Sequence, residues 1–272
     1  MAASPDLVDA CLRVLRQAPA ALITDIDGTI SAIAPTPAEA VVHPDARAAL
    51  QILATQLAAV AVVSGRAPEV GAAMVGLPDL IYVGNHGLER IMRGAAWTQR
   101  EAEAVRPAIA AALAEVAAAV HASQEAPWLL VENKGVTGTL HYRLAEDPEA
   151  AAALLEPLAR AAAARHGLRV TVGRMIVELR PNLAVNKGTA IRDLVHDLGL
   201  RGVLFFGDDA TDVDGFRVLR TLREAGQAAT LSVGVLGPET PAAVRETVDA
   251  TVYGVAETAA TLAALASHLA EQ

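Results

Sequence analysis

A short apolar run that ends in two aspartates constrains this chain more than any other feature. Residues 21–24 read Ala-Leu-Ile-Thr, which predicts a buried strand, and Asp25-Ile26-Asp27-Gly28-Thr29 follows directly. Side chains two residues apart in a strand share a face, so both carboxylates can address one reacting group. In open parallel α/β sheets, ligands bind at the carboxyl ends of the strands. The pattern therefore predicts such a strand, with a pair of acids at its functional end.

The paired acids suit the making and breaking of an acyl-phosphate. One carboxylate can act as the nucleophile while the other donates and accepts a proton. Asp-Gly-Thr is also an ordinary turn sequence, because Asp bonds to the nearby backbone and Gly tolerates a positive φ. The motif by itself therefore leaves a catalytic and a plain turn interpretation open.

Strands and helices alternate along both ends of the chain. The apolar patterns predict buried strands at 58–63, 80–83, 203–206 and 231–235, and helices at 45–57, 187–198 and 256–269. Strands separated by helices of this length indicate parallel βαβ units. Residues 1–100 and 183–272 are therefore expected to form one doubly wound α/β core.

The middle of the chain follows a different pattern. One long Ala-rich helix is expected over 101–123 and a second from Asp147-Pro148, with strands at 128–132, 136–144, 168–172 and 175–179. This α-β-β-α-β-β order indicates a small α+β module with an antiparallel sheet. Residues 101–182 are therefore expected to be a cap inserted into the core.

Composition limits the classes of protein to which the chain can belong. Of 272 residues, 53% are hydrophobic and 19% are charged, which is enough for a core and gives no sign of disorder. A net charge of -9 with 3% aromatic residues argues against nucleic-acid binding, which needs a basic surface. Cys11 is the only cysteine, so intrachain disulfides and multi-cysteine zinc sites are excluded.

The expected location follows from two further observations. No apolar run approaches the roughly 18 residues that a membrane helix needs. The N-terminus lacks the basic region and the long apolar stretch of a signal peptide. We therefore expect a cytoplasmic protein with neither a membrane nor a nucleic acid as partner.

Three further core segments place polar groups after a predicted strand or at the start of a predicted helix. They are Val63-Ser64-Gly65-Arg66, Lys187-Gly188 and Gly207-Asp208-Asp209-Ala210-Thr211-Asp212. Ser64 and Lys187, taken singly, are more simply a turn residue and a solvated first-turn residue. Adjacent acids at the end of a buried strand are harder to explain that way, because such charge needs a metal or a partner.

Together these groups suit a phosphate monoester, whose two negative charges repel an aspartate nucleophile. Mg²⁺ on oxygen ligands, a lysine and a hydroxyl group can compensate that repulsion. Asp25 and Asp208 are candidate Mg²⁺ ligands, and Asp27 can add its backbone carbonyl. Lys187 and Ser64 are candidates to hold the phosphoryl oxygens.

In this order, the four core segments resemble the motifs of the haloacid-dehalogenase-like phosphohydrolases, over roughly residues 21–265. The resemblance implies that Asp25 is the phosphorylated nucleophile and Asp27 the general acid and base. Ser64 and Lys187 match the second and third motifs. Asp208 and Asp212 match the acidic fourth motif.

A narrower set of segments is similar to the trehalose-6-phosphate phosphatase subgroup. The segments are Gly84-Asn85-His86-Gly87-Leu88-Glu89, Glu132-Asn133-Lys134, His141-Tyr142-Arg143, Glu178-Leu179-Arg180-Pro181 and Gly207-Asp208-Asp209-Ala210-Thr211-Asp212. Val213 departs from the pattern, because the subgroup usually has Glu there. The roles of Asp209, Asp212 and Asp214 are therefore not carried over.

This narrower resemblance implies a set of sugar-binding residues. A disaccharide offers hydroxyl groups, so its site needs carboxylates and a lysine as partners. The implied cap residues are Glu132, Lys134 and Glu178, and the implied substrate contacts of the core are Arg66 and His86. Each is otherwise an ordinary solvated or structural residue, and His141 and Arg143 are weaker candidates.

The implied activity is Mg²⁺-dependent hydrolysis of trehalose 6-phosphate, through an aspartyl-phosphate, by a monomer that acts after a trehalose-6-phosphate synthase. A phosphatase for another sugar phosphate, of the sucrose or mannosylglycerate type, shares the same core motifs. A sugar-phosphate mutase shares the nucleophile. A non-catalytic sensor usually lacks the nucleophile or the acid, and both are present. Glycosidases also use paired acids, but two acids only two residues apart fit phosphoryl transfer better.

Overall fold

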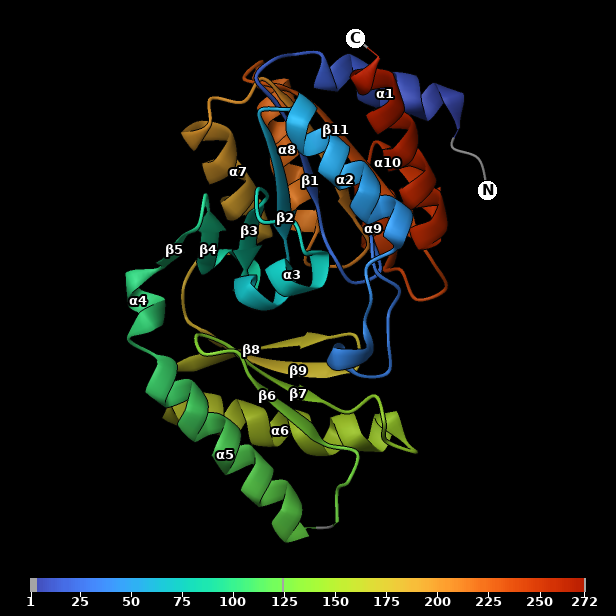
Figure 1. The fold of residues 1–272 in the computed structure, drawn as a ribbon. Helices are drawn as coiled ribbons and strands as arrows, with labels where there is room; N and C mark the ends of the chain where they lie inside the picture. The colour runs from blue at the N-terminus through green and yellow to red at the C-terminus, as the bar shows by residue number, and fades with distance from the viewer. Residues whose placement is uncertain (1–3, 124, 272) are drawn as a thin grey trace. The chain divides into compact units, whose positions relative to one another are not determined.

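The computed structural model describes residues 4–123 and 125–271 and divides into two compact units. The first unit holds the chain up to Trp97 and again from Val185. The second unit is Thr98–Ala184. Both ends of the chain, blue and red in Figure 1, therefore belong to the same unit.

A largely parallel eight-stranded sheet forms the centre of the first unit (Figure 1), in the order β12-β11-β10-β1-β2-β3-β4-β5. Strand β1 pairs in parallel with β10 on one side and β2 on the other, whereas β4 runs antiparallel to β3. The strands are β1 (Ala20–Thr24), β2 (Ala59–Val63), β3 (Ile81–Gly84), β4 (Glu89–Met92), β5 (Ala95–Thr98), β10 (Gly202–Gly207), β11 (Ala229–Leu236) and β12 (Ala250–Tyr253).

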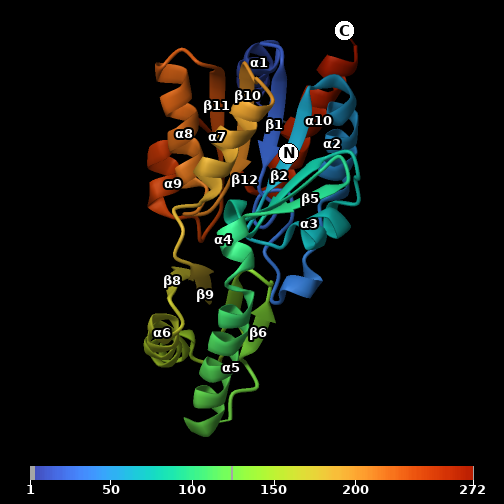
Figure 2. The same cartoon turned by 90° about the vertical axis from the view of Figure 1, so that its left-hand side faces the viewer.

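Helices cover both faces of this sheet, which explains why β2 and β10 consist only of apolar residues and glycine. In β10, Leu204 and Phe206 join the core beneath the helices on one face, and Val203 and Phe205 join the core on the other. Figure 2 shows α2 and α10 on one side of the sheet and α7 and α8 on the other. The doubly wound core predicted from the sequence is confirmed.

The helices of the first unit divide between these two faces. One core contains buried residues of α1 (Pro5–Leu15), α2 (Pro44–Gln56), α3 (Pro68–Val75) and α10 (Gly254–Ala270). The other contains buried residues of α7 (Lys187–Asp197), α8 (Val213–Glu224) and α9 (Ala242–Thr247). Two 3-10 turns, η1 (Pro37–Glu39) and η2 (Asn85–Gly87), follow β1 and β3.

The second unit is a four-stranded antiparallel sheet in the order β6-β7-β9-β8. Its elements are α4 (Arg100–Glu103), α5 (Arg106–Ser123), β6 (Leu130–Asn133), β7 (Gly138–His141), α6 (Pro148–Arg165), β8 (Leu168–Gly173) and β9 (Ile176–Pro181). Figure 1 shows α5 and α6 on the same face of this sheet, where Leu140, Val177 and Leu179 pack against them. The expected α-β-β-α-β-β order is confirmed from α5 onward.

The expectation of one continuous helix over 101–123 was wrong. Helix α4 ends at Glu103 and α5 begins at Arg106, with a turn between them. Pro107 explains the break, because its nitrogen cannot donate to the carbonyl four residues earlier and its ring crowds that carbonyl. The strand expected over 136–144 is also shorter than predicted, since only Gly138–His141 is paired as a strand.

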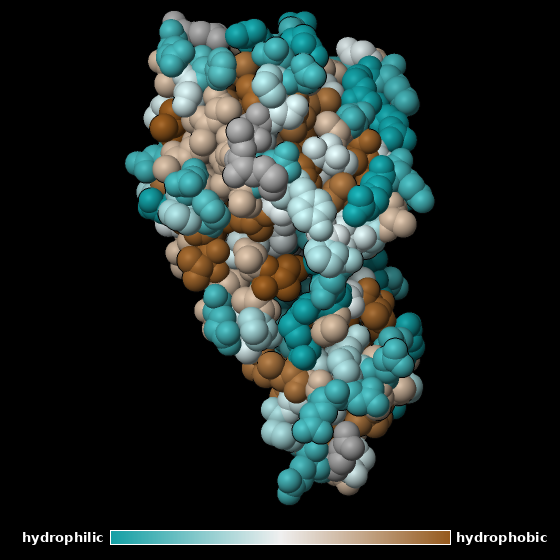
Figure 3. Space-filling view, turned by 90° about the vertical axis from the view of Figure 1, so that its right-hand side faces the viewer, coloured by the Kyte–Doolittle hydropathy of each residue, from teal (hydrophilic) through white to brown (hydrophobic). Residues whose placement is uncertain are grey.

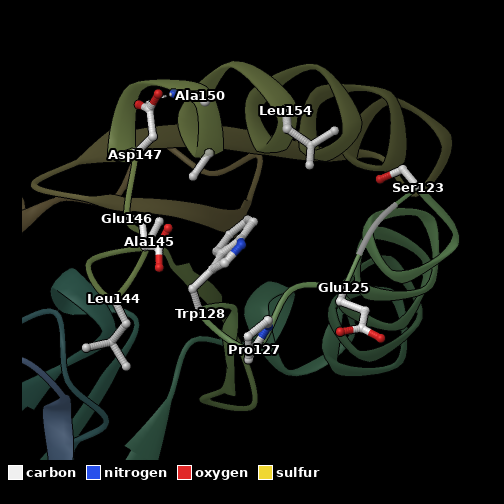
Figure 4. A pocket seen from close by; sticks show the side chains of 11 residues that line it. Ser123, Glu125, Pro127, Trp128, Leu144, Ala145, Glu146, Asp147, Ala150 and Leu154 are labelled. Atoms are coloured by element: carbon white, nitrogen blue, oxygen red, sulfur yellow. Dashed lines mark hydrogen bonds between the residues drawn. The ribbon is translucent and has the colours of Figure 1, made fainter.

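A pocket of about 770 Å³ lies beside α6 in the second unit (Figure 4). Its walls come from the end of α5, the segment before β6, the loop after β7 and the first turns of α6. The Trp128 ring points toward α6, where Ala150 and Leu154 line the same pocket. The described residues of this lining do not include Glu132, Lys134 or Glu178, so the pocket is distinct from the predicted sugar site.

One face of the molecule shows how apolar side chains are distributed on the surface. On the face in Figure 3, the hydrophobic residues drawn in brown form small groups between hydrophilic ones. Single exposed apolar side chains are normal on folded proteins. Within the described residues, no helix combines the length and the apolar character that crossing a bilayer requires.

Candidate active site

The strand ends of the first unit bring the core motifs to one edge of the sheet. Thr24, the last residue of β1, pairs with Phe206 of β10 and with Val62 of β2. Asp25, Ser64 and Asp208 follow these three neighbouring strands, so they leave the sheet at the same edge. The sequence motifs are thus adjacent because β1 lies between β2 and β10.

Lys187 joins two of the acids from the start of α7. Its Nζ lies 3.0 Å from Asp25 Oδ1 and 2.7 Å from Asp212 Oδ1, and it is only 2% exposed. Asn186 caps the helix through a reciprocal pair of hydrogen bonds with Thr189. This cap fixes the first turn of α7, and therefore the backbone from which Lys187 extends.

Asp212 organises the acidic segment that follows β10. Its Oδ2 accepts hydrogen bonds from the backbone N–H groups of Asp208 and Asp209, each at 3.0 Å, while its Oδ1 accepts from Lys187. Both oxygens of this fully buried carboxylate are therefore engaged within the protein. Asp212 holds Lys187 and the turn that carries Asp208, which is a role the sequence left open.

The Asp208 carboxylate lies against the loop after β1. Thr29 Oγ1 donates a hydrogen bond to Asp208 Oδ1 at 3.2 Å. Gly28 has a φ of 84°, and a Cβ atom there would collide with the Asp208 carboxylate. A residue with a side chain would thus strain the backbone and displace the acid.

Replacing Gly28 by alanine should therefore damage the Asp208 position more than the fold. We expect Mg²⁺ affinity or activity to fall by about 10–100-fold, the usual effect of disturbing the support of a metal ligand. Calorimetric titration with Mg²⁺, together with activity assays, would measure the loss. Gly94→Ala is the matched control, because Gly94 also has a positive φ, of 75°, but a Cβ added there would meet nothing within 4 Å. Equal losses in both variants would attribute the effect to backbone strain alone.

Burial and neighbouring charges shift the pKa values of both Asp25 and Lys187. Burial raises the pKa of Asp25 to about 7, against the opposing effect of the Lys187 ammonium, and Asp212 and Asp27 add to the rise. Burial alone would lower the pKa of Lys187, but Asp212 and Asp25 outweigh it and hold that pKa above its ordinary value. The lysine therefore stays charged, and Asp25 needs more positive charge nearby to ionise fully at neutral pH.

The cluster fits a divalent cation. Asp25, Asp208 and Asp212 each offer a carboxylate oxygen, and these atoms lie within 4.8 Å of one another. One lysine cannot balance three buried carboxylates, and Asp25 Oδ1 accepts no well-directed hydrogen bond from a described residue, although Lys187 Nζ is near. Mg²⁺ prefers such oxygen ligands. Since Asp212 is already engaged at both oxygens, Asp25 and Asp208 are the better candidate ligands.

Asp27 forms an ion pair with Arg66, at 2.6 Å between Asp27 Oδ2 and Arg66 Nε. The Asp27 carboxylate is not among the grouped metal-ligand oxygens of the described residues, and its backbone carbonyl stays a predicted ligand. Ser64 is buried, and its Oγ accepts a hydrogen bond from the Arg66 backbone at 3.3 Å. His86 adopts a positive φ of 59° and lies over Gly65.

The three predicted sugar-binding residues lie in the second unit, and two of them lie on strands. Glu132 pairs across the strands with Thr139, and Thr139 pairs with Glu178, which places Glu132, Thr139 and Glu178 on the face opposite the helices. Lys134 Nζ lies 3.0 Å from Glu178 Oε1, and Glu132 Oε2 lies 2.8 Å from His141 Nε2. The structure thus brings these residues together within their own unit.

The sequence did not predict the roles of two residues near the acids, Thr29 and Asp212. Thr29 supports Asp208, and only its place in the first motif could have indicated this. Asp212 follows Asp208 by four residues at the start of α8, a spacing that brings its carboxylate back onto the preceding turn. Val213, where the resembling subgroup usually has Glu, is buried in the apolar core beside Phe216.

Comparison with known proteins gives consistent matches. A family profile described as "Trehalose-phosphatase" matches residues 23–246. A trehalose-phosphate phosphatase of Mycobacterium marinum is 34% identical over 240 residues, which are 83% of this chain and 60% of that protein. The chain thus spans about 60% of the length of such curated relatives.

Solved structures extend the match to the fold. The C-terminal domain of Candida albicans trehalose-6-phosphate phosphatase superposes with a TM-score of 0.77 at 22% identity, covering 98% of each chain. A haloacid dehalogenase-like hydrolase from Bacteroides thetaiotaomicron superposes with a TM-score of 0.61 at 14% identity, covering 92% of this chain and 98% of that one. At these identities the superpositions establish the fold.

Proposed function

Since this chain belongs to the trehalose-phosphatase family, we propose that it hydrolyses trehalose 6-phosphate to trehalose and inorganic phosphate. The position of Asp25 carries the proposal. Its buried carboxylate follows the central strand β1, lies 3.0 Å from a buried lysine and belongs to a cluster of three acids. An aspartate nucleophile for a dianionic ester needs this kind of surrounding positive charge and oxygen-ligand chemistry.

In the first half of the proposed reaction, an Asp25 carboxylate oxygen attacks the phosphorus atom. A bond forms between that oxygen and phosphorus, and the bond between phosphorus and the sugar oxygen breaks. Asp27 gives a proton to the departing oxygen, so that the sugar leaves as a neutral alcohol. Asp25 then carries the phosphoryl group, and Asp27 is a carboxylate.

In the second half, Asp27 acts as the base. It takes a proton from a water molecule whose oxygen attacks the phosphorus atom, and the bond between phosphorus and the Asp25 oxygen breaks. Inorganic phosphate leaves, Asp25 is again a carboxylate and Asp27 is again protonated. One acid thus serves both steps without any net change in the enzyme.

Charge compensation comes from the groups beside Asp25. Lys187 and the Ser64 hydroxyl are proposed to bind phosphoryl oxygens. Bound to Asp25, Asp208 and the Asp27 backbone carbonyl, Mg²⁺ would neutralise charge on the transferring group. Asp212 keeps Lys187 and the Asp208 turn in place.

Removal of divalent metal should abolish this activity. Protein dialysed against EDTA is expected to show no measurable phosphatase activity, and Mg²⁺ should restore it. Zn²⁺ should be a poor substitute, because the proposed ligands are all oxygen atoms. Full activity in protein shown to be metal-free by elemental analysis would rule out the proposed metal site.

Substrate identity is tested by a panel of sugar phosphates in ¹⁸O-labelled water. Trehalose 6-phosphate should be hydrolysed with the highest kcat/KM, and the label should appear in the released phosphate. If sucrose 6-phosphate or a mannosylglycerate phosphate were preferred, the proposed substrate would be wrong, but the proposed hydrolysis reaction would stand. A phosphorylated sugar product without label in phosphate would instead indicate a mutase.

The residues of the second unit are proposed to select the sugar without entering the chemistry. Changing Glu132, Lys134 or Glu178 to Ala should slow turnover of trehalose 6-phosphate. Each lost charged hydrogen bond should raise the free-energy barrier by about 1.5–3 kcal/mol. Hydrolysis of p-nitrophenyl phosphate, which has no second sugar, should change much less. Glu103→Ala, an exposed acid of α4, is the matched control. Equal loss on both substrates would assign these residues to folding instead.

A further inference from the structure

Arg66 holds both oxygens of the proposed acid and base. Its Nε donates to Asp27 Oδ2 at 2.6 Å and its Nη2 donates to Asp27 Oδ1 at 2.7 Å. Its Nη1 donates to the Pro37 carbonyl at 3.0 Å. The guanidinium therefore binds Asp27 on one side and the Pro37 carbonyl on the other. The paired hydrogen bonds fix the plane of the Asp27 carboxylate as well as its distance from the guanidinium.

The backbone of Arg66 is itself anchored by η2, the 3-10 turn that follows β3. The Arg66 carbonyl accepts a hydrogen bond from Asn85 N at 2.8 Å, and the Ser64 carbonyl accepts one from His86 N at 3.0 Å. Gly65 and Gly84 permit this close approach. A Cβ on Gly65 would lie 2.8 Å from the His86 ring, and one on Gly84 would lie 2.6 Å from the Arg66 carbonyl oxygen.

The contacts with Arg66 restrict the Asp27 side chain to one orientation, which its place in the backbone alone does not do. Asp27 lies beyond the end of β1, just before the turn at 28–30, and its side chain is 34% exposed. The Arg66 side chain is 11% exposed and is held at both ends. A partly exposed carboxylate beyond a strand end samples several rotamers unless a rigid neighbour restricts it, and proton transfer requires one of them.

We propose that Arg66 is a positioning residue for Asp27, rather than a residue that contacts the sugar. The proposal rests on the function proposed above, because it needs Asp27 to transfer protons. Arg66 presents the carboxylate in one plane at the strand end. Replacing Arg66 should therefore slow only the steps in which Asp27 gives or takes a proton.

This dependence predicts a selective defect. Departure of a sugar oxygen needs a proton from Asp27, whereas p-nitrophenolate leaves unaided. Arg66→Ala should slow phosphorylation of Asp25 by trehalose 6-phosphate about tenfold or more, within the range of general acid catalysis. The burst of p-nitrophenolate, followed by stopped flow, should stay within about threefold of the wild-type rate, because that step needs no proton transfer. A residue that binds phosphate, or that supports the fold, would slow both.

A double-mutant cycle with Asp27→Ala separates positioning from substrate contact. The cycle uses steady-state hydrolysis of p-nitrophenyl phosphate, in which Asp27 still activates water. If Arg66 acts through Asp27, Arg66→Ala should cost about twofold or less in the Asp27→Ala background, since the partner is already lost. Additive losses would overturn the proposal. Arg66→Lys, which keeps the charge and loses the paired geometry, should show the same selectivity as Arg66→Ala.

Two controls keep the outcomes distinct. Arg90→Ala removes another arginine of the first unit, paired with Asp197, and should leave both substrates unaffected. Urea unfolding of each variant identifies a general loss of structure. Because the cycle uses p-nitrophenyl phosphate, it remains valid if the natural sugar differs from trehalose. If the enzyme hydrolyses trehalose 6-phosphate but the losses of the two single variants add in the double variant, the positioning role of Arg66 is rejected and the proposed function stands.

Discussion

Replacing Asp25 by asparagine is expected to reduce turnover of every phosphate monoester by about 10⁴-fold or more, as for other covalent nucleophiles. The amide has the shape of the carboxylate but cannot form the acyl-phosphate. It is also a poorer ligand for a divalent cation. Steady-state assays with trehalose 6-phosphate and p-nitrophenyl phosphate would measure the loss. Radiolabelled phosphate from either substrate should no longer become attached to the protein.

The fold should survive this change. Asp25 is buried, and burial opposes its charge, so a neutral amide removes a desolvation cost. Unfolding in urea should therefore show no loss of stability that could explain the missing activity. Asp197→Asn, at an exposed acid of α7, is the matched control and should remain active. Activity of Asp25→Asn within tenfold of wild type would remove Asp25 from the nucleophile role.

The arrangement of three core motifs was predictable because each follows a short, mainly apolar run. The short apolar runs before Asp25, Ser64 and Asp208 favour strands buried on both faces, and parallel strands bring their carboxyl ends to one edge. The observed pairing of β1 with β2 and β10 confirms that expectation. Local pattern and sheet geometry together were sufficient at these positions.

Local pattern was insufficient where a long-range contact decides the outcome. Arg66 and Asp27 are 39 residues apart, and their contact depends on side-chain rotamers at the ends of two different strands. The sequence shows that residue 212 is an aspartate but not what it binds. Its carboxylate accepts hydrogen bonds from the backbone of Asp208 and Asp209 only because of the turn before α8. The first residue of α8, Val213, was compared only with a motif position, while its burial in the core reflects the helix that starts there.

The largest effect on stability is expected from Lys187→Met. Lys187 is 2% exposed and lies between the buried carboxylates of Asp25 and Asp212. Methionine has a similar length but no charge, so the acids would lose their shared cation. Removing one partner of a buried ion pair typically costs about 3–5 kcal/mol. Urea unfolding in EDTA should show a loss of this size, and phosphatase activity should disappear with it.

A second substitution shows whether charge or packing causes that loss. In Lys187→Met combined with Asp212→Asn, the buried acid that Lys187 contacts most closely becomes a neutral amide. The oxygen of this amide can still accept the backbone bonds of Asp208 and Asp209, so the turn keeps its support. Because the uncompensated charge is gone, the double variant should be more stable than Lys187→Met alone. Mg²⁺ should also stabilise Lys187→Met by replacing the missing positive charge. If the double variant were the less stable of the two, packing of the lysine stem would be its main contribution to the fold.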